Sequence, residues 1–209
     1  ACGFANEPGD RFCGGCGAAL AAAAATPPQR ERRQVAVLFV DLVGFTAMTA
    51  ELGAEDTQAL LSGFLGAVDA IVESHGGTVD KHIGDCVMAV FGAPVSHGND
   101  AARAVAAALA IRDAVPGIVT NTRPLAVHIG VAGGQVVASG TGSAMHREYT
   151  VTGDTVNLAA RLEQLTKETG SQVLVSNSVH AAVAADGAVD LGPLAIRGYD
   201  EKVQVWRVM

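Results

Sequence analysis

The sequence Val35-Ala36-Val37-Leu38-Phe39-Val40-Asp41-Leu42-Val43-Gly44-Phe45-Thr46 carries the strongest structural signal in the chain. Its first six residues are all apolar, which is typical of a strand buried on both faces of a sheet. Asp41 ends this run, a glycine-containing turn follows, and residues 46–74 have the apolar spacing of a helix. An aspartate placed there lies at a sheet edge, beside backbone amides that suit phosphate oxygens. Taken alone, Asp41 is explained equally well as a cap of the next helix.

Strands and helices alternate along the rest of the chain. Gly84-Asp85 predicts a hairpin turn, and Gly133-Gly134 predicts a second turn between two strands. The order predicts an α+β fold, a ferredoxin-like βαββαβ layer with extra strands. The further strands are predicted at 78–83, 87–91, 125–132, 135–139, 173–176, 189–196 and 203–208, and the further helices at 99–115, 154–169 and 177–185.

Composition limits the class of protein. The chain has 209 residues, enough for one domain with a small appendage. No apolar run is long enough to cross a membrane. The net charge of −7 argues against a general nucleic-acid binder, although bound metals can still neutralise the phosphates of a nucleotide. The four cysteines do not form a secreted disulfide framework, so we expect a cytoplasmic protein.

A second carboxylate lies in the stretch Lys81-His82-Ile83-Gly84-Asp85. Aspartate is common in turns, so Asp85 alone indicates little. In a ferredoxin-like sheet, however, the end of the first strand and this hairpin are neighbours, so Asp41 and Asp85 should converge. Two such carboxylates repel, and divalent cations relieve the repulsion. A pair of metals held in this way can activate a hydroxyl and stabilise a leaving phosphate.

A third stretch, Tyr149 to Leu162, places Asn157 and Arg161 four residues apart on one predicted helix face. An amide and a guanidinium together suit a phosphoryl group that gains charge in a transition state. An isolated pair of this kind is more often part of a solvated surface.

Together these stretches resemble the class III adenylyl/guanylyl cyclase catalytic domain, in the family's order, over about residues 34–208. The resemblance implies that Asp41, Leu42 and Asp85 bind two divalent cations, Mg²⁺ or Mn²⁺. It also implies that Asn157 orients the ribose and that Arg161 stabilises the transition state. Phe45 and Thr46, in the turn after Asp41, would bind the substrate.

The choice of base depends on two positions. Lys81 matches the base-reading lysine of adenylyl cyclases, where guanylyl cyclases usually carry Glu, and a lysine can donate to adenine N1. Thr150 falls where many adenylyl cyclases carry Asp. A threonine at this position resembles the subgroup that includes bicarbonate-responsive soluble cyclases, so bicarbonate is an expected activator. ATP is the expected substrate because of Lys81.

The resemblance also implies a homodimer. In the family one chain supplies the metal-binding aspartates, and the other supplies the residues that match Lys81, Thr150, Asn157 and Arg161. All are present here, so a symmetric dimer would hold two complete sites. The family's C-terminal triphosphate-binding lysine has no clean match, and Arg197 and Lys202 are the candidates.

The N-terminal cysteines resemble part of a zinc ribbon. Cys13 and Cys16 form a CxxC pair, and Cys2-Gly3 is similar to the end of a second pair. Structural zinc normally takes four ligands, and Cys2, Cys13 and Cys16 supply three. Cys86 is better explained as a small buried hydrophobe. The expected organisation is a ribbon-like segment at 1–19, a linker at 20–33 and a cyclase domain at 34–209.

We therefore expect an adenylate cyclase, a lyase that converts ATP to cyclic AMP and pyrophosphate. The main alternative is a catalytically silent cyclase-like module that binds nucleotide or bicarbonate and regulates another domain. A different two-metal enzyme on a palm-like fold is a further alternative. The chain lacks the Gly-Gly-Asp/Glu-Glu-Phe hairpin of a diguanylate cyclase, and its acidic net charge argues against a polymerase. A zinc-ribbon interaction protein with an inert α+β domain would leave the paired aspartates unexplained.

Overall fold

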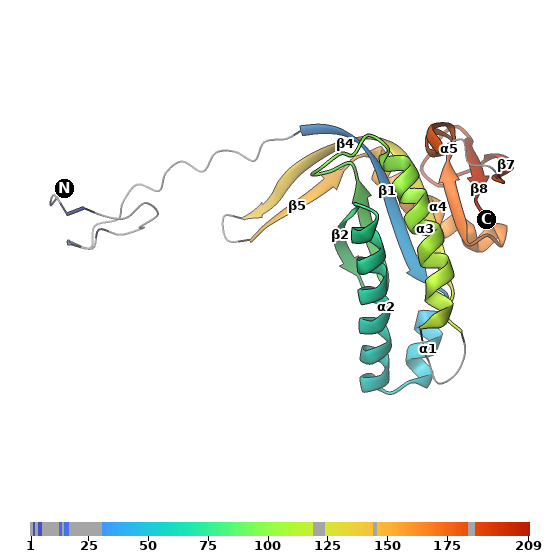
Figure 1. The fold of residues 1–209 in the computed structure, drawn as a ribbon, viewed down its shortest axis with the longest axis horizontal. Coiled ribbons are helices and arrows are strands. Elements are labelled where there is room, and N and C mark those ends of the chain that lie inside the picture. Colours follow the sequence, from blue (N-terminus) through green and yellow to red (C-terminus); the bar gives the residue numbers. More distant parts are fainter. Residues whose placement is uncertain are drawn as a thin grey trace.

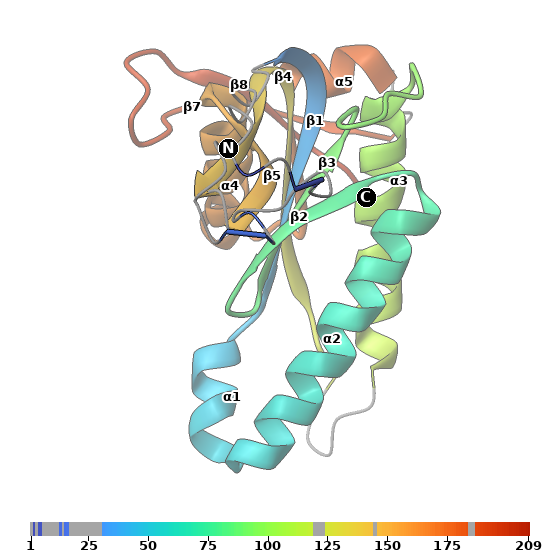
Figure 2. The ribbon, with the colours of Figure 1, turned by 90° about the vertical axis from the view of Figure 1, so that its left-hand side faces the viewer.

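A computed structural model describes residues 2, 4–5, 13, 15–16, 31–118, 124–143, 146–183 and 187–209. Its sheet has the order β2-β3-β1-β4-β6-β8-β7, with β5 paired to β4, and helices cover both faces (Figures 1 and 2). The predicted α+β class is confirmed. The strands are β1 Glu31–Leu42, β2 Thr78–Ile83, β3 Cys86–Phe91, β4 Val127–Ser143, β5 His146–Thr152, β6 Val173–Ser176, β7 Val189–Leu194 and β8 Val203–Arg207. The helices are α1 Phe45–Glu51, α2 Ala54–Ser74, α3 Asp100–Ala114, the 3₁₀ turn η1 Val115–Gly117, α4 Asp154–Thr169 and α5 Asn177–Val183.

β1 is an interior strand of the sheet, between β3 and β4, and its apolar run is buried on both faces as predicted. Leu38 and Val40 point into a core that includes Phe64 and Ile111 of α2 and α3. Val37 points the other way, into a second core that includes residues of α4. Continuous burial explains why β1 has no polar face between Val35 and Val40.

The strand order β2-β3-β1-β4 with α2 and α3 on one face is the predicted ferredoxin-like unit. β1 is antiparallel to both β3 and β4. α4 packs on the opposite face against β1, β4 and β6. The C-terminal strands extend the sheet beyond β4 through the parallel pair of β4 and β6.

The helix predicted over residues 46–74 is in fact two helices, so that prediction was wrong in its continuity. Leu52 and Gly53 between α1 and α2 have extended backbone, with ψ angles of 147° and 165°. The apolar spacing continues across this break and therefore does not reveal it.

The turn predicted at Gly133-Gly134 was also wrong, because both glycines lie inside the single strand β4. They are needed for close packing and not for chain reversal. A Cβ on Gly134 would lie 2.5 Å from Thr155 Oγ1 of α4. A Cβ on Gly130 would lie 2.3 Å from both the carbonyl oxygen of Ala159 and the amide nitrogen of Glu163. α4 therefore rests directly on the backbone of β4.

The folded domain begins slightly earlier than expected. β1 begins at Glu31, three residues inside the expected linker, and its first three residues pair with Ala138, Val137 and Val136 of β4.

Among the described residues, no helix is both long and apolar enough to cross a membrane.

The contact between α4 and β4 gives a stability prediction. Gly130→Ala should lower the free energy of unfolding by about 2 to 3 kcal/mol, because α4 has to move away from the added methyl group. The matched control is Gly66→Ala in α2, where a Cβ would have no atom within 4 Å. That change should raise stability by about 0.5 to 1 kcal/mol. Chemical denaturation measures both, and a Gly130→Ala variant as stable as the unchanged chain would contradict the close contact.

Candidate active site

Asp41 and Asp85 lie together at one end of β1. Asp41 is the second-last residue of the strand, and Gly44, with φ of 71°, then turns the chain into α1. Asp85 occupies the β2–β3 turn, which lies beside β1 because Val40 pairs with Val87. Burial, and then the negative charge of Asp41, raise the pKa of Asp85 above its ordinary value. The two carboxylates are therefore close enough to repel each other.

A pocket of about 310 Å³ lies over these carboxylates. Its partly buried carboxylates offer the oxygen ligands that Mg²⁺ and Mn²⁺ take in proteins. Burial and the neighbouring charge of Asp41 both raise the pKa of Asp85, and a divalent cation would offset both effects. The residues present therefore fit such a cation. We call this the carboxylate pocket, lined by Asp41, Leu42, Gly44, Phe45, Thr46, Asp85, His128 and Lys167.

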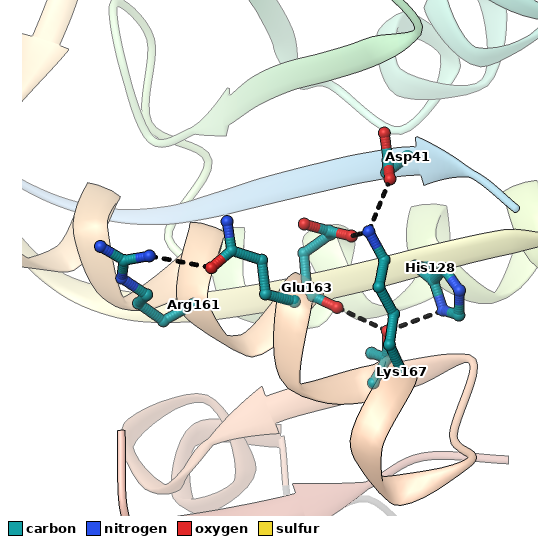
Figure 3. Close-up of polar contacts among 7 residues, drawn as sticks. Asp41, His128, Arg161, Glu163 and Lys167 are labelled. Atoms are coloured by element: carbon teal, nitrogen blue, oxygen red, sulfur yellow. Dashed lines mark hydrogen bonds and ion pairs between the residues drawn. The ribbon is translucent and has the colours of Figure 1, made fainter. Parts of the chain in front are cut away.

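Lys167 of α4 supplies a positive charge to this pocket. Figure 3 shows its ammonium between two carboxylates, 3.0 Å from Asp41 Oδ2 and 3.2 Å from Glu163 Oε1. Burial lowers the pKa of Lys167, but the hydrogen bonds to Asp41 and Glu163 outweigh burial, so the net shift is upward. The lysine is therefore held charged against Asp41.

His128 also lines the pocket, and Glu163 lies next to it on the other side of Lys167 (Figure 3). The Glu163 side chain is only 8% exposed, and burial raises its pKa although Lys167 lies beside it. His128 Nδ1 lies 2.7 Å from the hydroxyl of Thr166. Burial, and then the charge of Lys167, lower the pKa of His128, which favours the neutral imidazole.

Sequence reasoning missed Glu163, Lys167 and His128 as neighbours of Asp41. The spacing of Glu163 and Lys167 is i,i+4, which on sequence alone indicates an ordinary exposed ion pair. Only the direct contact of α4 with β4 shows that this helix face is turned toward the end of β1. His128 lies opposite Asp41 in the β1–β4 ladder, so a correct strand register is the signal that reveals it.

A second group of polar residues joins β2 to β5; we call Asp80, Lys81 and Thr150 the β2–β5 cluster. Lys81 Nζ donates to Thr150 Oγ1 at 3.1 Å, so the two candidate base-reading residues meet within one chain. Thr150 is buried, with 6% of its surface exposed. Its hydroxyl lies 2.9 Å and 2.8 Å from the two carboxylate oxygens of Asp80.

Asp80 is the member of this cluster that sequence reasoning missed. Its side chain is 4% exposed, lies 3.2 Å from Lys81 Nζ, and accepts a hydrogen bond from the Val151 amide at 3.2 Å. Neighbouring residues of a regular strand point to opposite faces, so Asp80 and Lys81 would normally diverge. The pairing of β2 with β3 shifts between Val79 and Lys81, and this irregularity lets both side chains reach Thr150.

Asn157 and Arg161 lie on α4 as predicted, one turn apart. Asn157 is exposed, and Arg161 is half-buried with its Nη1 donating to Gln164 Oε1 at 2.8 Å. Arg161 and Arg197 line a small pocket of about 70 Å³ that shares no residue with the carboxylate pocket. Lys202 is exposed and lines neither pocket.

The predicted site residues thus fall into separate groups within one chain. Asp41, Leu42, Phe45, Thr46 and Asp85 line the carboxylate pocket. Within the described residues, no hydrogen bond or ion pair links Asp41 or Asp85 to Lys81, Thr150, Asn157 or Arg161. Among the described residues, neither the carboxylate pocket nor the smaller pocket beside Arg161 brings all of them together.

The cysteines also form two sets. The sulfur atoms of Cys2, Cys13 and Cys16 all lie within 4.8 Å of one another, and those of Cys2 and Cys13 are 3.3 Å apart. Cys86 is half-buried at the start of β3. Burial, followed by the charges of Asp41, Glu163 and Asp85, raises the pKa of its thiol to about 12. A protonated thiol agrees with the interpretation of Cys86 as a small apolar residue.

The ion pair of Lys167 gives a prediction about metal binding. In the presence of a chelator, Lys167→Met should lower the free energy of unfolding by about 1 kcal/mol, because half-exposed ion pairs are strongly screened. Millimolar Mg²⁺ or Mn²⁺ should then raise the melting temperature of the variant more than that of the unchanged chain, since the cation no longer competes with the ammonium. Thermal denaturation with and without metal measures both effects. Lys202→Met is the control, and equal metal-induced shifts in all three proteins would refute the competition.

Comparison with known proteins identifies the family. The sequence model of the "Adenylate and Guanylate cyclase catalytic domain" matches residues 28–208. The uncharacterized protein Rv1320c of Mycobacterium tuberculosis is 38% identical over 180 residues, which are 84% of this chain and 31% of that protein. The chain therefore spans about a third of the length of the curated relatives it matches.

Solved structures agree with this match. The adenylyl cyclase CyaB from P. aeruginosa has a TM-score of 0.78 and 32% identity, over 87% of this chain and 96% of that one. The guanylate cyclase domain of RhGC from Catenaria anguillulae, in complex with GTP, has a TM-score of 0.76 and 28% identity, over 86% and 98%. A sequence match over most of the chain and a shared fold lead to one conclusion: the chain belongs to the adenylate and guanylate cyclase catalytic domain family.

Proposed function

We propose that this chain is an adenylate cyclase that converts ATP to 3′,5′-cyclic AMP and pyrophosphate. The observation that carries the choice of ATP is the contact of Lys81 Nζ with Thr150 Oγ1 at 3.1 Å. The similar structures include both adenylyl and guanylyl cyclases, so the fold alone does not select the base. The selection has to come from the side chains that meet the base.

The donors and acceptors of these side chains favour adenine. A lysine ammonium only donates, which suits the unprotonated N1 of adenine and not the N1–H of guanine. The hydroxyl of Thr150 is able to accept from the amino group of adenine. Both residues lie side by side on β2 and β5, where one base edge can contact them together.

Catalysis in this proposal depends on positioning and on charge. Divalent cations bound by Asp41 and Asp85, with the backbone of Leu42, would supply the charge that acidifies the ribose 3′-hydroxyl and neutralises the phosphates. Phe45 and Thr46 begin α1, where backbone amides suit the triphosphate. Asn157 orients the ribose, Arg161 stabilises the charge that develops on the α-phosphoryl group, and Arg197 or Lys202 contacts the remaining phosphates.

The reaction is an in-line displacement within one nucleotide. The 3′-oxygen loses its proton to solvent and forms a bond to the α-phosphorus, while the bond from that phosphorus to the bridging oxygen of the β-phosphate breaks. Pyrophosphate leaves with the electron pair of that bond, so the products are cyclic AMP and pyrophosphate.

The same proposal requires a homodimer. Asp41 and Asp85 line a pocket that contains none of Lys81, Thr150, Asn157 or Arg161. A two-fold axis that sets the carboxylate pocket of one chain against the β2–β5 cluster and α4 of its partner would complete two equivalent sites. The cytoplasm, which holds ATP, is the proposed location.

The runner-up is a catalytically silent, cyclase-like module that binds nucleotide or bicarbonate. The chain keeps both aspartates and the Asn157–Arg161 pair, which argues for a working enzyme. Bicarbonate remains a proposed activator, on the ground that Thr150 stands where many adenylyl cyclases carry Asp.

The proposal predicts the products of a direct assay. Purified protein with Mg²⁺ or Mn²⁺ should make cyclic AMP from ATP in preference to cyclic GMP from GTP, with bicarbonate as an added arm. Asp41→Ala and Arg161→Ala should each lower turnover by at least about 100-fold, because each removes charge that meets the transition state. Chromatographic detection of both cyclic nucleotides measures this.

Mixing the two inactive variants tests the dimer in the same assay. A heterodimer of Asp41→Ala and Arg161→Ala keeps one intact site, so an equal mixture should regain about a quarter of the original activity. Cyclic GMP as the main product would refute the choice of base. No product from dimeric protein would favour the silent module.

We also propose that Cys2, Cys13 and Cys16 bind zinc, which their sulfur distances support. Thiolates at these distances suit a tetrahedral ion that takes its fourth ligand elsewhere. Protein purified without chelator should contain about one zinc per chain by elemental analysis. Cys13→Ser should lose it, whereas Cys86→Ser should keep it, and equal zinc content in both variants would contradict the site.

A further inference from the structure

Asp80 holds the hydroxyl of Thr150 in one orientation. Thr150 Oγ1 lies 2.9 Å and 2.8 Å from the two oxygens of Asp80, while Lys81 Nζ approaches the same hydroxyl oxygen at 3.1 Å. Only 4% of the Asp80 side chain is exposed, and its other contacts are Lys81 and the Val151 amide. This is a closed network with a defined direction for each hydrogen.

Counting donors and acceptors fixes that direction. A threonine hydroxyl has one hydrogen and two lone pairs, a carboxylate only accepts, and an ammonium only donates. The hydrogen of Thr150 is therefore directed to Asp80, and one of its lone pairs takes a hydrogen from Lys81. The remaining lone pair can accept a hydrogen bond, but the hydroxyl has no hydrogen left to donate.

We propose that Asp80 is a specificity-determining residue for the base of the nucleotide, acting through Thr150 as a positioning residue. The proposal rests on the ATP cyclase activity proposed above and explains how its base is chosen. Adenine presents an amino group at position 6, which can donate to the free lone pair of Thr150. Guanine presents a carbonyl oxygen there, which needs a donor that Thr150 cannot supply while Asp80 binds its hydrogen.

Without Asp80 this distinction is lost. A free hydroxyl rotates and can either donate or accept, so it would serve the amino group of adenine and the carbonyl of guanine about equally. Asp80 thus gives a neutral threonine the acceptor role that a carboxylate would have at the same position.

The competing explanation is that Asp80 only ties β2 to β5 through the Val151 amide. Loss of that tie would weaken ATP and GTP use together. The ratio of the two substrates separates the explanations, because a structural defect does not change which base is preferred.

The test is the ratio of kcat/KM for ATP to that for GTP in Asp80→Asn. The amide of asparagine can donate to Thr150 and so frees the hydroxyl to turn, and the ratio should fall about tenfold. Asp80→Ser replaces the carboxylate with a small hydroxyl and should lower the ratio as well. This second variant keeps the test valid if Asp80→Asn fails to fold. Asp69→Asn is the matched control, since Asp69 contacts His82 of the same strand at 3.0 Å outside the cluster.

Thr150→Val supplies the second half of the test. If Asp80 acts through the hydroxyl, the ratio should not change further when Asp80→Asn is added to Thr150→Val. A ratio unchanged in Asp80→Asn, or an equally large effect of Asp80→Asn when valine replaces Thr150, would overturn the proposal.

Binding of 3′-deoxy-ATP and 3′-deoxy-GTP, which lack the attacking hydroxyl, separates this inference from the proposed activity. Calorimetry should show a preference for 3′-deoxy-ATP that Asp80→Asn reduces. That result in a protein that makes no cyclic nucleotide would support the role of Asp80 and refute the enzyme. Cyclic AMP production with an unchanged preference in Asp80→Asn would support the enzyme and refute the role of Asp80. If the unchanged chain shows no preference for adenine, both the choice of ATP and the role of Asp80 are refuted.

Discussion

The burial of β1 on both faces determines how the other elements of the domain are placed. Its alternate side chains enter two different cores, one under α2 and α3 and the other under α4. A strand buried in this way cannot slip by one residue without exchanging the two sets of side chains. The register of β1 with β3 and β4 is therefore fixed, and with it the position of Asp41 beside the β2–β3 turn and opposite His128.

The electrostatics of the carboxylate pocket follow from this placement. The fold brings Asp41, Asp85 and the buried Glu163 toward one point, and the pKa values of Asp85 and Glu163 rise because their negative charges are poorly solvated there. Lys167 compensates part of that charge from the neighbouring helix. Such a concentration of charge reduces stability in the absence of cations, and it is typical of a site kept for binding and not for folding.

The sequence predicted the features that depend on local pattern. The apolar run of β1, the β2–β3 hairpin and the one-turn spacing of Asn157 and Arg161 are all local, and the structure contains each of them. Glycines misled the prediction at Gly133-Gly134, because a glycine that makes room for a helix has the same sequence signal as one that turns the chain. Asp80 was missed because a strand irregularity has no reliable pattern, and Lys167 because its role depends on how α4 lies against β4.

The separation of the β2–β5 cluster from the carboxylate pocket has an evolutionary consequence. The residues proposed to contact the base lie on strands, apart from those proposed to hold metal, so substitutions at Asp80, Lys81 or Thr150 leave Asp41 and Asp85 in place. A change of base preference then requires no change in the carboxylate pocket. A scaffold divided in this way offers one reason why adenylyl and guanylyl cyclases share so similar an architecture.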